Sequence, residues 1–61
     1  MCKQDLIDCL MQLNELRGQQ GRPTLDGLDT IAAGMLAGAP PAGDKERLRY
    51  LYDGLMALAT V

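Results

Sequence analysis

Apolar residues recur at helical spacing along the first segment of the chain. The intervals between them are four, three, four and three residues, at Cys2, Leu6, Cys9, Leu13 and Leu16. This alternation is typical of a helix with one apolar stripe and a coiled-coil periodicity. Arg17 suits the negative end of the helix dipole, and Gly18 is a favourable capping residue. The pattern predicts a helix over residues 3–17.

Two later segments have a similar periodicity. In residues 24–37 the intervals are three, four and three, at Leu25, Leu28, Ala32 and Met35, and Thr24 can cap the first turn. In residues 44–60 one face is apolar, formed by Leu48, Leu51, Tyr52, Leu55, Leu58 and Ala59. The chain has no alternating strand pattern. Residues 1–61 are therefore predicted to form a single all-α domain, a compact bundle of three helices over about 3–17, 24–37 and 44–60.

The segment "GAPPAGDK", from Gly38 to Lys45, is close to the glycine-rich loop that binds phosphate. Such a loop points consecutive backbone N–H groups at the anion, and its lysine directly follows the second glycine. Here the lysine comes one position later, and Pro40 and Pro41 remove two donors. We therefore interpret the segment as a connection between two helices and expect no nucleotide to bind there.

The size of the chain favours self-association. Sixty-one residues are near the lower limit at which one hydrophobic core offsets the loss of chain entropy. The core must be built from Leu, Ile, Met and Ala, because the chain has neither Phe nor Trp. Two cysteines without a histidine make structural zinc an unlikely reinforcement, and Cys2 and Cys9 are too far apart on a helix for a disulfide. We expect a homodimer or a higher oligomer.

Charge and hydropathy argue against binding to nucleic acid or to a membrane. The net charge is −2, and no segment carries a strongly basic field. The longest uncharged run, residues 30–43, has fourteen residues with two prolines and is too short to span a bilayer. Asp5 and Asp8 interrupt what would be the apolar part of a signal peptide. We therefore expect a cytoplasmic protein with reduced thiols.

The first helix has more apolar surface than the packing of two neighbouring helices requires. Its apolar residues cover an arc of roughly 220°. We predict that Ile7, Leu10 and Met11 bind a partner or a second copy, unless the other two helices cover them. The second helix carries a face of small residues that includes Gly34 and that suggests a closely approaching helix, or else a plain solvent face.

The chemistry available to the chain indicates a binding protein rather than an enzyme. No histidine can activate a thiolate, and no pair of carboxylates has a spacing that suggests acid–base catalysis. We expect no cofactor and no metal. The hypothesis that follows is a non-enzymatic protein-binding module that acts stoichiometrically, as an inhibitor, adaptor or regulator of another protein. The alternatives are a structural subunit or secretion-type chaperone folded on its partner, and a small DNA-binding regulator.

Overall fold

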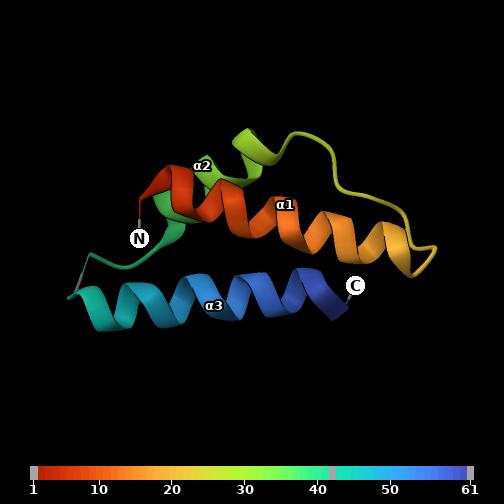
Figure 1. Cartoon of the computed structure of the whole chain (residues 1–61). Coiled ribbons are helices and arrows are strands. Elements are labelled where there is room, and N and C mark those ends of the chain that lie inside the picture. Colours follow the sequence, from red (N-terminus) through yellow and green to blue (C-terminus); the bar gives the residue numbers. More distant parts are fainter. Residues whose placement is uncertain (1, 42, 61) are drawn as a thin grey trace.

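Three α-helices make up most of the chain in the computed structural model, which describes residues 2–41 and 43–60. They are α1 (Lys3–Gln19), α2 (Leu28–Gly38) and α3 (Asp44–Thr60) (Figure 1). The described residues include no strand. The predicted all-α three-helix fold is confirmed, and the bounds of α3 match the prediction.

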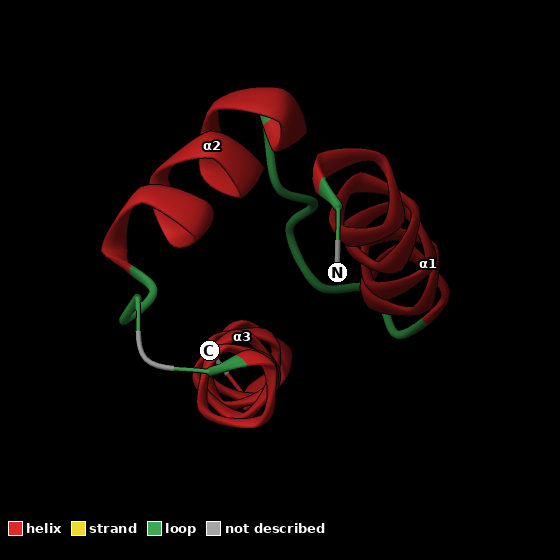
Figure 2. Ribbon diagram, turned by 90° about the vertical axis from the view of Figure 1, so that its left-hand side faces the viewer, coloured by secondary structure: helices red, strands yellow, loops and turns green. Residues whose placement is uncertain are grey.

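The helices α1 and α3 lie side by side and run in the same direction. The helix α2 packs beside both and carries the chain back from the end of α1 toward the start of α3. Figure 1 shows both α1 and α3 beginning at the left and ending at the right. Figure 2 looks nearly along these two helices and shows α2 from its side, crossing them near the end where both begin. Because α2 has only 11 residues, it covers one end of the pair of 17-residue helices.

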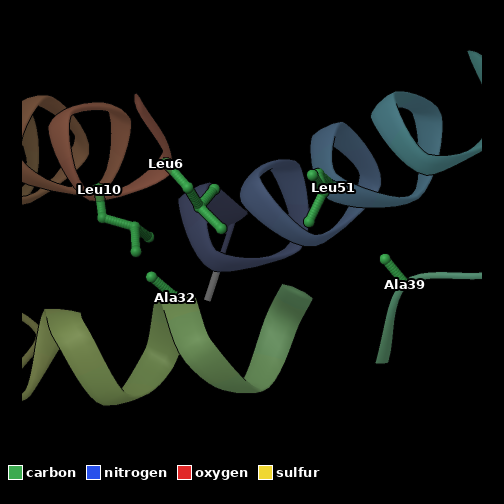
Figure 3. Close-up of a cluster of buried hydrophobic side chains, with 5 residues drawn as sticks. All are labelled: Leu6, Leu10, Ala32, Ala39 and Leu51. Atoms are coloured by element: carbon green, nitrogen blue, oxygen red, sulfur yellow. The ribbon is translucent and has the colours of Figure 1, made fainter. Parts of the chain in front are cut away.

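The core lies where the three helices meet and is aliphatic, as the sequence predicts. Its buried members come from all three helices and from the connection after α2: Leu6, Leu10, Ala32, Ala39 and Leu51 (Figure 3). Half-buried apolar residues surround them, among them Ile7, Leu28, Ile31, Met35, Leu36, Leu55 and Leu58. Only three large side chains are fully buried, so the core of this chain is small.

The end of α1 is set by Gly21 rather than by Gly18. Gly21 has a φ of 71°, and the N–H groups of Gly21 and Arg22 donate to the carbonyls of Gly18 and Arg17 at 3.1 and 2.9 Å. This pair of bonds is a Schellman motif, which satisfies the last carbonyls of the helix. The predicted end of the helix at residue 17 is therefore wrong by two residues, because the second of two nearby glycines takes the left-handed conformation.

The predicted start of the second helix at Thr24 is also wrong, since α2 begins at Leu28. Asn14 of α1 binds the backbone of Leu25 twice: its Nδ2 donates to the carbonyl at 2.9 Å, and its Oδ1 accepts from the N–H at 2.5 Å. The first of these bonds uses a carbonyl that a helix starting at Thr24 would need, and the second holds the N–H of Leu25 to α1. Gly27, with a φ of 66°, then redirects the chain into α2.

The "GAPPAGDK" segment is a connection between helices, as predicted. Gly38 ends α2, and Gly43, with a φ of 67°, precedes the first residue of α3. Arg47 reaches back from α3, and its Nη1 donates to the carbonyls of Ala39 and Pro40 at 3.3 and 3.1 Å. Arg47 thus satisfies carbonyls at the end of α2 and fixes the connection to α3.

Two arginines hold the ends of α1 and α3 together. Arg17 is buried, and it donates to the carbonyl of Pro23 at 2.8 Å and to that of Leu58 at 3.0 Å. Arg22 donates to the carbonyl of Ala59 at 2.8 Å. Both arginines therefore place positive charge at the negative end of α3, where it is favourable.

Candidate functional site

An apolar groove of about 340 Å³ lies between α1 and α3. Two residues of α1 and four of α3 line it: Cys9, Leu13, Tyr52, Leu55, Met56 and Ala59. All six are apolar or carry a single polar atom, and none is charged. We call this feature the α1/α3 groove.

The groove exists because α1 turns a different face toward the core than its stripe predicts. The buried positions of α1 are Leu6, Leu10 and Arg17. Of the predicted stripe only Leu6 is buried, whereas Cys2 is exposed, Cys9 and Leu13 are half-buried, and Leu16 is 54% exposed. Cys9, in the middle of the predicted stripe, therefore does not belong to the buried core. Cys9 and Leu13 line the groove because Leu10 and Arg17 occupy the inner face of α1.

The wall formed by α3 is also more exposed than predicted. Tyr52 was expected on the core face, but it is 54% exposed, and Met56 is 67% exposed. The buried face of α3 is centred on Leu51, with Leu55 and Leu58 half-buried beside it. Met56 follows Tyr52 by four residues and so lies on the same side of the helix. The sequence carried this signal, since Met56 is a large apolar residue placed four positions after Tyr52.

The four sequence-predicted site residues do not come together. Leu10 is fully buried in the core, and Ile7 is half-buried against it, so α2 and α3 cover both. Met11 is 55% exposed on the outward face of α1. Gly34 is exposed on α2, and a Cβ added to it would meet no atom within 4 Å. Leu10 is thus unavailable for docking on this monomer.

Within the predicted small-residue face of α2, which also includes Gly38, a close approach occurs at Gly38 and not at Gly34. A Cβ on Gly38 would lie 2.8 Å from the hydroxyl of Tyr50, which belongs to α3. The matching glycine on α3 is Gly54, where a Cβ would lie 2.9 Å from the Cε of Met35. These two glycines let α2 and α3 pack closely, so part of the small-residue pattern serves the fold itself.

Charged residues lie further round both helices than the apolar lining of the groove. Asp5 and Asp8 are exposed on α1, and Lys45 and Arg49 are exposed on α3. Asp8 accepts a hydrogen bond of 3.0 Å from Gln4. Within residues 2–41 and 43–60 an ion pair joins Lys3 to Asp29, with Nζ and Oδ1 3.1 Å apart.

Two further depressions lie on the outward faces of single helices. One of about 350 Å³ is lined by Asp8, Met11, Gln12 and Glu15 on α1. The other, of about 430 Å³, is on α3 and is lined by Lys45, Glu46, Leu48, Arg49, Tyr52 and Asp53. Each is built by one helix and has charged walls, so neither encloses a ligand in the way that small-molecule sites do.

The described residues show no arrangement that would hold a metal ion, since no three of their His, Cys, Asp or Glu side chains cluster. Cys2 and Cys9 are free thiols. Within the same residues, no helix combines the length and the apolar character needed to cross a membrane.

Comparison with known proteins identifies no relative. No family model matches the chain, and neither a curated protein nor a solved structure matches it. The function is therefore argued from the surface alone.

Proposed function

We propose that this chain is a non-enzymatic protein-binding module that uses the α1/α3 groove to dock a helical surface of another polypeptide. The observation that supports this proposal is the gathering of exposed apolar side chains along the groove. Two of the most exposed large apolar residues, Tyr52 and Met56, line the groove. Contiguous apolar surface of this kind marks interaction sites in proteins that work in water.

The spacing of the groove residues favours a helical partner. Cys9 and Leu13 on α1 are separated by four residues. Tyr52, Leu55 and Ala59 on α3 are separated by three and four. Such intervals form the ridges that pack against another helix. A pair of parallel helices with two such ridges offers a surface that one or two further helices can complete as a bundle.

Tyrosine and methionine give the groove the character of a binding surface. Aromatic residues and methionine are enriched where proteins meet, and methionine adapts its shape to different neighbours. The proposed role is stoichiometric, as an inhibitor, adaptor or regulator in the cytoplasm. A structural subunit that completes its small core on a partner is the alternative that the same groove supports.

Site-specific photo-crosslinking in the cells that produce the chain tests this proposal. A photoreactive amino acid is placed at Met56, and in a matched variant it is placed at Met11. Both methionines are exposed, at 67% and 55%, but Met11 lies outside the groove. We expect a discrete protein adduct from position 56 and none, or a much weaker one, from position 11. No adduct from position 56, or equal adducts from both, would contradict the proposal.

A further inference from the structure

We propose that oxidation of Met56 to its sulfoxide switches off docking in the α1/α3 groove, so that the groove is sensitive to peroxide. This inference rests on the proposed function of the groove and names its regulation. The exposure of the Met56 side chain, its apolar surroundings and the positions of Met11 and Met35 lead to it.

The side chain of Met56 is open to water in the undocked chain. Met56 is the most exposed large apolar residue in the described part of the chain, at 67%. It belongs to the wall of the groove that α3 forms, one turn after Tyr52. Small oxidants therefore reach it while the groove is empty, and a helix docked in the groove would cover it. The switch thus acts on the free chain, before docking.

Hydrogen peroxide is the class of oxidant that this thioether takes. A lone pair of the Met56 sulfur attacks one oxygen of the peroxide, an S–O bond forms and the O–O bond breaks. The sulfur is oxidised, and the peroxide is reduced to water when the proton of the attacked oxygen moves to the departing hydroxide. Dedicated reductases return methionine sulfoxide to methionine, so the change is reversible.

The sulfoxide suits the groove less well than the thioether does. The side chains that line the groove are apolar or carry a single polar atom, and Tyr52 and Cys9 are those with a hydrogen to donate. The S–O group is a polar acceptor, and a polar group that is buried without a hydrogen bond raises the free energy of the complex. Oxidation of Met56 should therefore weaken docking about tenfold or more.

The other described methionines provide internal controls. Met35 is half-buried, and its Cε would lie 2.9 Å from a Cβ added to Gly54 of α3, so peroxide should reach it slowly. Met11 is 55% exposed, and it lines the depression that α1 builds alone, outside the groove. Met11 should react with peroxide about as readily as Met56, but its oxidation should leave docking unchanged.

Photo-crosslinking with a purified, oxidised chain tests the inference. The photoreactive amino acid is placed at Tyr52, which also lines the groove and leaves Met56 in position. The chain is oxidised with hydrogen peroxide, treated with dithiothreitol to restore the thiol of Cys9, and added to an extract of the cells that produce it. Peptide mass spectrometry measures the sulfoxide at Met11, Met35 and Met56. We expect the yield of the protein adduct to fall about tenfold as Met56 is oxidised, and to recover after treatment with methionine sulfoxide reductases.

Matched variants assign the effect to Met56. In Met11→Leu the yield should fall on oxidation as in the wild type. In Met56→Leu the yield of the oxidised sample should equal that of the same variant before oxidation. Met56→Gln places a polar group in the groove without any oxidant and should give a low yield in both states, whereas Met11→Gln should behave like the wild type. Far-UV circular dichroism checks that each variant is helical.

An oxidised wild-type chain that forms the adduct as well as the reduced chain would overturn the inference, and the proposed function would stand. An equal loss of adduct in oxidised Met56→Leu would also overturn it, because another group would then carry the effect. If the reduced chain forms no adduct from position 52 or from position 56, the proposed function fails and this inference fails with it.

Discussion

The guanidinium of Arg17 donates a hydrogen bond of 3.0 Å to the carbonyl of Leu58 and so joins the last turns of α1 and α3. The same side chain donates to Pro23 in the loop that leaves α1. One buried cation therefore joins three segments, which are the end of α1, the loop that follows it and the end of α3.

Replacing Arg17 should destabilise the fold. Arg17→Met keeps much of the volume but leaves the carbonyls of Pro23 and Leu58 without this donor, and we expect a loss of about 2 kcal/mol. Arg17→Lys should recover only part of it, because lysine lacks the planar fork that reaches two carbonyls at once. Urea unfolding measures the free energies. In the control Glu15→Ala, at an exposed position, the free energy of unfolding should stay within about 0.5 kcal/mol of the wild-type value. An equally small change in Arg17→Met would contradict the stabilising role of the hydrogen bonds that Arg17 makes.

Alanine substitution of two glycines should have opposite effects on stability. Gly21 has a φ of 71°, so Gly21→Ala forces a left-handed conformation that costs about 1–2 kcal/mol. Gly34 is in the middle of α2 with open space around it, so Gly34→Ala should stabilise the helix by about 1 kcal/mol. Thermal unfolding, monitored by circular dichroism, compares the stabilities of the two variants with that of the wild type. A loss of stability on Gly34→Ala would instead reveal a close neighbour at that face.

The carboxamide of Asn14 should control the order of the loop before α2. Asn14→Asp keeps the acceptor for the N–H of Leu25 but removes the donor to its carbonyl. We expect a loss of about 1 kcal/mol and faster hydrogen exchange at the amides of this loop. Gln12→Glu is the matched amide-to-acid control on the exposed side of α1, and its loop amides should exchange as in the wild type. Unchanged exchange in Asn14→Asp would show that the loop is held by other contacts.

No nucleotide should bind at the connection between α2 and α3. The prolines remove backbone donors, and Asp44 and Glu46 flank Lys45 with negative charge. Calorimetric titration with ATP and Mg²⁺ should give no saturable heat. Saturable heat that disappears in Lys45→Ala would contradict this prediction.

The sequence predicted the helices well because their periodicity and their glycine and proline boundaries are local signals. It did not predict the start of α2, because the bonds between Asn14 and Leu25 depend on tertiary contact. It also gave Arg17 only the role of a favourable charge at a helix end. Once Arg17 is buried, α1 rotates its stripe out of the core, and this rotation moves Cys9 and Leu13 to the groove. The candidate site could not be located before the relative rotation of the helices was known.

The central claim is that the α1/α3 groove is the interaction surface, and a comparison of Met56→Glu with Met11→Glu tests it most directly. Both variants place one carboxylate on an exposed methionine position, but only Met56 lines the groove. Sedimentation equilibrium of the two helical variants and the wild type gives the association constants. We predict that Met56→Glu is monomeric, since a charge buried without a partner is costly, and that Met11→Glu associates like the wild type. Association that survives Met56→Glu, or that is lost in Met11→Glu, would contradict the account.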